Sequence, residues 1–226
     1  MTKARNTPGR VRATPRRKPG PPAAPVFPQE RARATRRALL EAARLLFADK
    51  GYDAAQTPDI AAAAGVSVGT FYRYFDDKRQ VFVEMIRAHL DEGHERVMAR
   101  LTAERFGDGD NRAAIDLTLE VMFEFVARFP SLMRLALEMA LRDPEVDEAR
   151  LAFEERAEDG VAALIAQVVP RRVVPDARAA AVVLVRSTME VALATTADGR
   201  RRGRASQAAV KLALREMIHR YLFPSR

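Results

Sequence analysis

The stretch AGVSVGTFYRYFDDK, residues 64–78, restricts the fold more than any other part of the chain, because very small residues meet four aromatic rings there. Gly65 can adopt the left-handed conformation of a tight turn between helices, and Val66 is placed to fill the angle between them. Ser67 can cap a short helix from Val68 to about Phe75 with its hydroxyl. This layout predicts a helix-turn-helix, a motif whose second helix enters the major groove of DNA.

The four rings fall into two groups on the expected helix. Successive residues are about 100° apart, so Phe71 and Phe75, four positions apart, share one side and are expected to face inward. Tyr72 and Tyr74 offer hydroxyls that can bond phosphate oxygens. The alternative is an ordinary three-helix core with surface tyrosines, because helix-turn-helix angles also occur in proteins that do not bind DNA.

The other residues of this helix suit a close approach to DNA. Gly69 and Thr70 are small enough to let the helix come near the phosphate backbone. Val68 can contact a thymine methyl group, and Arg73 can donate two hydrogen bonds to guanine, a pairing worth about 1–3 kcal/mol of discrimination. We therefore expect Val68 and Arg73 to read the base sequence.

Two helices are expected before this one. Apolar residues recur every three or four positions from Leu39 to Phe47, an amphipathic pattern, and Gly51 supplies a stop. In the second helix Pro58 suits the first turn and restricts Thr57 to an extended conformation, so Thr57 is the expected N-cap.

A long fourth helix is expected to begin at Asp76 or Asp77 and to continue to about residue 101. Gly93 interrupts its sequence. It is interpreted as a bend, as the true end of the helix, or as a glycine tolerated on the surface, and we favour the last. Gly and Pro then divide the chain into helices over about 112–129, 130–141, 144–169, 176–196 and 205–223. The expected fold is all-α, with about nine helices.

The run DIAAAAGVSVGTFYRYFDDKRQVF, residues 59–82, resembles the N-terminal sequence of TetR-type transcriptional regulators, and with the first helix the resemblance covers about residues 30–82. It implies a three-helix head joined by the fourth helix to an effector-binding and dimerisation body. It departs from the family at Gln56, where Ser or Thr is frequent. The resemblance implies that eight positions lie at or near DNA: Ser67, Val68, Gly69, Thr70, Tyr72, Arg73, Tyr74 and Lys78. Thr57, beside the departure at Gln56, is added as a further candidate for a phosphate contact.

The resemblance also implies a function: a homodimer, assembled through the last two helices, that binds a palindromic operator in double-stranded DNA and is released by a small-molecule effector, most simply as a repressor. Apolar residues on several faces of those helices agree with a partner surface. Large apolar residues of the body are the candidate pocket, or else ordinary core. They are Met122, Phe125, Phe129, Met133, Phe153 and Met189.

The positive charge of the chain is concentrated at its N-terminus. The net charge is +8, but seven of the 38 basic residues precede the first acidic one, Glu30, which leaves 31 basic against 30 acidic residues. Residues 1–28 are rich in Pro and Gly and are expected to be a disordered arm. This arm either neutralises DNA phosphates or is a solubilising extension or a misassigned start. The predicted domains are therefore 1–28, 29–75 and 76–226.

Other classes of function find less support. The chain has no Cys, which excludes disulfides and thiolate metal sites, and His89 and His94 are badly spaced to chelate a metal. No phosphate loop or nucleophile elbow is found, so neither catalysis, metal nor cofactor is expected. No signal peptide or uninterrupted apolar span is found, which favours a cytoplasmic protein without membrane contact.

Two alternatives to an effector-controlled regulator stay open. One is an architectural protein that binds DNA through its arm, indifferent to base sequence and without an effector. The other is a ligand-binding or protein-interaction module whose head no longer recognises DNA. A polar stripe over residues 112–128, with a charged residue at every fourth position, is either a solvated face with ion pairs or a set of carboxylates facing a cavity.

Overall fold

The computed structural model describes residues 28–107, 109–196 and 205–224, and this part of the chain contains helices and no strand. The all-α expectation is therefore confirmed for the described residues. The predicted arm, apart from Pro28, and the loop at 197–204 lie outside them. The helices are α1 (Pro28–Ala54), α2 (Thr57–Ala63), α3 (Val68–Phe71), α4 (Lys78–Met98), α5 (Ala103–Gly107), α6 (Asn111–Arg128), α7 (Pro130–Ala140), α8 (Pro144–Val168), α9 (Ala177–Thr196) and α10 (Gln207–Leu222).

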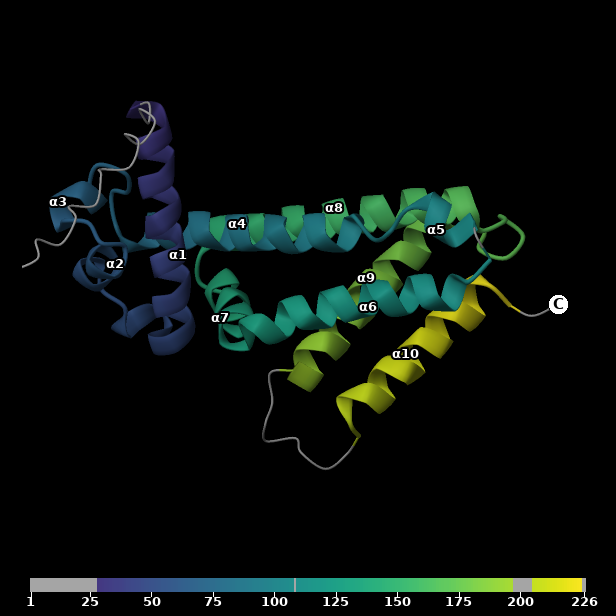
Figure 1. Ribbon diagram of the computed structural model, residues 1–226. Coiled ribbons are helices and arrows are strands. Elements are labelled where there is room, and N and C mark those ends of the chain that lie inside the picture. Colours follow the sequence, from purple (N-terminus) through teal and green to yellow (C-terminus); the bar gives the residue numbers. More distant parts are fainter. Residues whose placement is uncertain (1–27, 108, 197–204, 225–226) are drawn as a thin grey trace, which may run out of the picture.

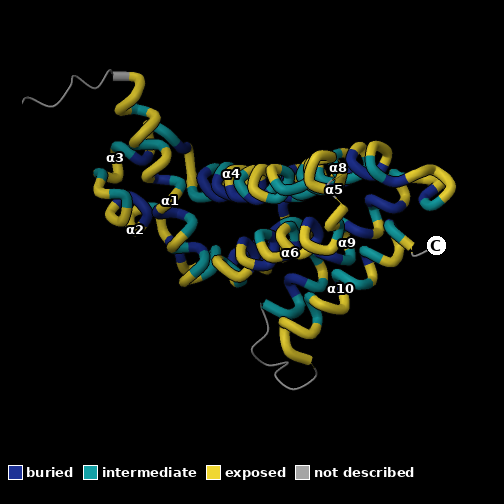
Figure 2. The backbone as a smooth tube through the Cα atoms, turned by 45° about the vertical axis from the view of Figure 1, so that its right-hand side comes forward, coloured by how far each residue is buried: buried dark blue, intermediate teal, exposed yellow. Residues whose placement is uncertain are grey.

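The helices divide between a head and an elongated body (Figure 1). α1, α2 and α3 gather at one end, and α4 leads from them into the body, where α8 and α6 pack beside it. α9 and α10 lie obliquely to these helices. Buried residues follow the inner faces throughout (Figure 2), and one hydrophobic cluster extends from Phe47 in the head to Leu222 in the body. The predicted boundary at 75/76 stays a prediction, because this core is continuous across it.

Local chemistry sets the turn of the helix-turn-helix as expected. Gly65 has a φ of 70°, a conformation that favours glycine, and Val66 packs against the core between α2 and α3. Ser67 caps α3, since its hydroxyl accepts a hydrogen bond from the Thr70 amide at 3.1 Å. Gly51, the expected stop of the first helix, has a φ of 76°, and α1 changes direction there before it ends at Ala54.

The predicted N-cap of α2 is wrong by one residue. Gln56, not Thr57, is extended, and its carbonyl accepts the first helical hydrogen bond, from the Ile60 amide at 3.1 Å. Thr57 is already the first helical residue. Pro58 disfavours the helical conformation of Thr57, but the helix still forms. Its first hydrogen bond comes from the Ile60 amide, so the amide hydrogen that Pro58 lacks is not needed.

One further feature differs from the expectations. The stretch after α4 contains the short helix α5, which packs against α6 and α8 and whose Phe106 is buried. In addition, α9 is long and apolar enough, by length and composition alone, to cross a membrane. It packs against α6, α8 and α10, and its Arg186 pairs with Glu158 of α8 at 3.0 Å.

Candidate functional site

The exposed surface of α3 and of the turn after it carries the residues expected to read DNA; α3 ends at Phe71, so the prediction that this helix continues to about Phe75 is wrong. Val68 is 39% exposed and Tyr72 is 53% exposed, and Gly69 and Arg73 are exposed beside them. Phe71 and Phe75 are buried, as expected, and anchor the helix to the head. The head therefore presents a small exposed surface that carries the Arg73 guanidinium and the Tyr72 phenol.

Thr57 and Tyr72 lie together although they are on different helices. Their hydroxyl oxygens are 3.2 Å apart, so the two side chains share a hydrogen bond. Ser67 and Thr70 form a second hydroxyl pair at 3.0 Å. Each pair can still offer lone pairs or a proton to a phosphate oxygen, the group that positions a protein on a duplex.

The structure gives Lys78 and Tyr74 packing roles as well. The Lys78 ammonium donates to the carbonyls of Tyr52 at 2.8 Å and Asp53 at 3.3 Å, and lies 4.5 Å from the centre of the Tyr52 ring. A cation at the last carbonyls of α1 is favourable because that helix end is negative. Tyr74 is half-buried against the core. A DNA contact by either residue stays a prediction.

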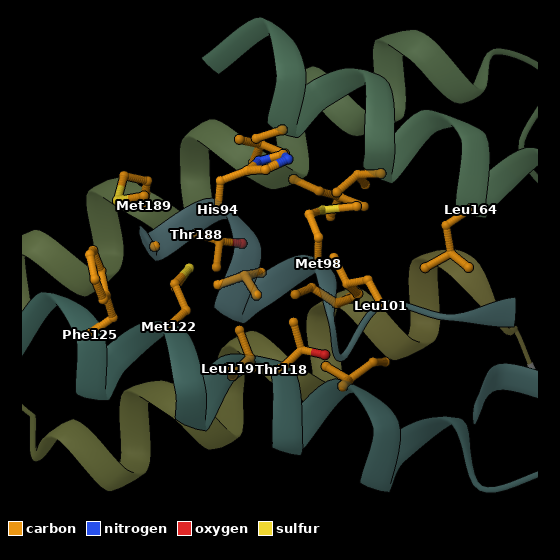
Figure 3. Close-up of a pocket in the computed structure, with 18 of the residues that line it drawn as sticks. His94, Met98, Leu101, Thr118, Leu119, Met122, Phe125, Leu164, Thr188 and Met189 are labelled. Atoms are coloured by element: carbon orange, nitrogen blue, oxygen red, sulfur yellow. The ribbon is translucent and has the colours of Figure 1, made fainter. Parts of the chain in front are cut away.

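The body contains a cavity of about 150 Å³ bounded by helices α4 to α10. Five of the six predicted pocket residues line it: Met122, Phe125, Met133, Phe153 and Met189. Phe129 is not among its lining residues and packs instead under the Arg44 guanidinium at 4.6 Å. Figure 3 shows Met122, Phe125, Met189 and Thr188 on one stretch of the wall and Leu101 and Leu164 on another.

Gly93 is neither a surface glycine nor the end of a helix, so the interpretation favoured above is wrong. It is buried in an unbroken α4 and lines the cavity. A Cβ atom there would lie 2.6 Å from the Phe125 ring, which is far inside contact distance. Gly93 is therefore the position where the ring of α6 approaches the backbone of α4, a role that depends on a distant neighbour and has no local sequence pattern.

His89 of α4 packs behind the cavity wall and was not among the predicted site residues. It is 2% exposed and its ring stacks on Phe125 with centroids 4.5 Å apart, while Phe129 meets it edge-on. Neither ring nitrogen has a hydrogen-bond partner in the described structure. Burial, reinforced by the charge of Arg44, lowers the pKa of His89 to about 4, so the ring is neutral near pH 7.

The N-terminus of α8 is joined to α4 by a two-bond ion pair. Arg79 donates to the two carboxylate oxygens of Asp143, at 2.5 and 2.7 Å, and also pairs with Glu145 at 3.1 Å. Asp143 is buried and caps α8 by accepting from the Glu145 amide. The Arg79 hydrogen bond lowers the pKa of the Asp143 carboxyl. This pair links the helix that follows α3 to a helix that lines the cavity.

The polar stripe of α6 faces other helices and not the cavity. Arg112 pairs with Glu216 at 3.4 Å, Asp116 pairs with Arg215 at 2.7 Å, and Glu120 pairs with Lys211, all on α10. None of these residues lines the cavity. The interpretation as a surface with ion pairs is the one that agrees with the structure. No cluster of side chains able to hold a metal ion is present among the described residues.

A sequence profile of "Bacterial regulatory proteins, tetR family" matches residues 39–85, which span the second half of α1, α2, α3 and the start of α4. Over this segment the chain is a TetR-family sequence. The curated proteins to which it is similar include a transcriptional activator and a transcriptional repressor. One, the activator FasR of Mycolicibacterium smegmatis, is 30% identical over 130 residues, 57% of this chain and 58% of that protein.

A second relative, the repressor KstR2 of Rhodococcus jostii, is 43% identical over 54 residues, which are 24% of this chain and 26% of that protein. The chain thus spans less than two thirds of either curated relative. Among solved structures, a putative TetR-family regulator from Mesorhizobium loti superposes with a TM-score of 0.70 and 21% identity, covering 85% of this chain and 96% of that one. This likeness extends the TetR fold over the body.

Proposed function

We propose that this TetR-family protein is a DNA-binding transcriptional regulator that acts as a dimer on a palindromic operator. The exposed surface of α3 and the turn after it carries the proposal: Val68, Tyr72 and Arg73 are exposed there, and the buried rings of Phe71 and Phe75 anchor the segment to the head. A two-fold dimer repeats this face, with half-sites about 34–36 Å or a multiple of that distance apart. The proposal assigns the protein no catalytic role and places it in the cytoplasm.

The dimer is proposed to form through α9 and α10. These helices keep large apolar side chains exposed, among them Val183, Leu212, Met217 and Tyr221. Such a surface costs free energy in water and is typical of an interface. Because α9 and α10 also line the cavity, occupancy of the cavity can alter the separation of the two heads.

The direction of regulation is proposed to be repression, relieved by an effector in the body. KstR2 carries the name of a repressor, whereas FasR carries the name of an activator. An effector can release the protein only if it binds the DNA-free state more tightly than the bound one. Transcription of a reporter from the recovered operator, with and without the protein, decides the direction, and activation would refute repression while leaving the operator intact.

The experiment that tests the function is sequencing of the DNA fragments that the protein selects from random DNA at about physiological salt. Full-length protein, a chain beginning at Gln29 and an Arg73→Ala variant are run together. We expect a palindrome from the first two samples, and loss of one guanine preference from the third. Recovery that is indifferent to sequence, and vanishes without the arm, would instead favour the architectural alternative.

A further inference from the structure

The wall of the cavity is made almost wholly of carbon and sulfur. Its lining residues include no Asp, Glu, Lys or Arg, and its polar residues are His94, Thr118 and Thr188. The Thr118 hydroxyl is already bonded to the Ala114 carbonyl at 2.9 Å, whereas the buried His94 Nδ1 atom has no hydrogen-bond partner among the described residues. A charged group inside would lose its hydration and meet no opposite charge on the wall, so the wall favours an uncharged occupant.

The cavity is also long. Its lining runs from Leu90 to Met98 on α4 and from Phe153 to Val168 on α8, two helices that pack side by side. At a rise of about 1.5 Å per residue these stretches span roughly 12 and 22 Å. The volume of about 150 Å³ is therefore spread along an elongated space, which we call the channel.

The channel can adapt along its length. Four of the eight methionines of the chain line it: Met98, Met122, Met133 and Met189. Met is unbranched and has three rotatable bonds, so it yields to irregular contacts more readily than a branched residue. A flexible occupant longer than the present space can therefore be admitted by rotation of these side chains.

We propose that the cavity takes a single straight hydrocarbon chain, such as that of a fatty alcohol, an acyl compound or another single-chain lipid. The polar head of this ligand stays outside the channel. The inference rests on the proposed function in taking the cavity as the effector site, and it adds the chemical class of the effector. We infer a chain-shaped ligand because the cavity is elongated. We infer that the buried part of the ligand is uncharged because the described part of the cavity wall has no charged residue.

The test is direct binding to the full-length protein without DNA, by displacement of a fluorescent apolar probe. Straight-chain alcohols from hexanol to tetradecanol are compared, and affinity should rise about fourfold per methylene until the channel is full. Dodecanoate and dodecanedioate form a matched pair with equal chain length. The dicarboxylate must bring a charge into the channel, so we expect it to bind at least a hundredfold more weakly than the monocarboxylate.

Equal affinity for the two carboxylates, no dependence on chain length, or tighter binding of a rigid sterol than of any chain would overturn the proposal. Ala157→Phe, which places a ring in the channel, should shorten the longest chain accepted. Ala163→Phe, on the exposed side of the same helix, is its control. If circular dichroism shows that Ala157→Phe does not fold, Val161→Ile adds a single methyl at the same wall and should lower affinity for the longest chains alone.

Operator binding, measured separately, distinguishes this proposal from the function it rests on. Chains that bind the protein without changing operator affinity support the ligand class and contradict effector release. If the protein binds its operator but binds none of the hydrocarbon chains, the ligand class is contradicted and the DNA-binding function stands.

Discussion

The two residues that couple α4 to its neighbours most closely, His89 and Gly93, face the same Phe125 ring. His89 has a buried imidazole without a hydrogen-bond partner among the described residues, and Gly93 has no side chain, which leaves room for the ring. Neither feature touches DNA or carries charge at neutral pH. Their consequences are therefore expected in stability and in its dependence on pH.

His89 should make the protein less stable in mild acid. Its pKa is about 4 in the folded chain against 6.5 ordinarily, so the unfolded chain binds more protons between these values. The free energy of unfolding therefore keeps its full value above about pH 6.5 and falls as the pH drops toward 4, by up to about 3 kcal/mol from this residue. Arg44 and Arg128 reinforce the shift, and Glu92 and Glu41 oppose it.

The measurement is urea unfolding at several pH values between about 4 and 7.5 for the wild type and for His89→Leu. The variant keeps an apolar group against Phe125 and has nothing to protonate, so its free energy of unfolding should fall less in acid. Identical slopes for the two proteins would show that His89 is not buried as a neutral ring in solution.

Gly93→Ala should destabilise the protein, although Gly→Ala inside a helix usually stabilises it by about 1 kcal/mol. The new methyl would lie 2.6 Å from the Phe125 ring and force it to move, which costs about 1–3 kcal/mol. Gly69→Ala is the control for stability, since its new methyl group would lie 3.9 Å from the Ser67 hydroxyl, an ordinary contact distance. Phe125→Leu should recover most of the loss in the double variant, and no recovery would place the strain elsewhere.

At the scale of elements, the pair between Arg79 and Asp143 fixes α4 against the start of α8. Arg79→Gln leaves a buried carboxylate with only its capping bonds, so we expect a loss of stability larger than that from an exposed pair. The stabilisation from this carboxyl is present above its ordinary pKa and is lost as pH falls below that value, because the folded pKa is lowered.

Arg142→Gln is the matched control for this pair. Arg142 pairs with Glu138 at 2.8 Å, but both side chains are more than half exposed, so its loss should cost under about 1 kcal/mol. Thermal unfolding of the two variants provides the comparison. Equal small losses would mean that the Arg79 pair is screened like an ordinary surface pair.

The whole molecule depends on the surface of α9 and α10. A charge at Val183, which is 64% exposed, should prevent the proposed dimer because the interface would have to bury it. Val183→Asp is expected to sediment as a monomer and to bind operator at least tenfold more weakly. Leu141→Asp introduces the same charge at a residue that is 90% exposed and lies outside these helices, and should remain dimeric. A dimeric Val183→Asp would place the interface elsewhere.

Local interactions made much of this protein predictable from its sequence. The turn at Gly65, the cap at Ser67, the inward pair Phe71 and Phe75, and most helix ends depend on residues within four positions of one another. The match to a known family extended these local patterns to a fold. The errors of this kind lie at helix ends: the N-cap of α2 is shifted by one residue from Thr57, and α3 ends at Phe71 and not near Phe75.

Tertiary structure alone decided the rest, because it depends on which distant side chain meets which. The partner of Lys78 is a carbonyl 26 positions away, and Gly93 is explained only by a ring on another helix. Phe129 and Phe125 have similar sequence surroundings, yet one packs under Arg44 and the other lines the cavity. Helix periodicity shows that a face is apolar, whereas the packing of α4, α6 and α8 determines whether that face fills a core or encloses a channel.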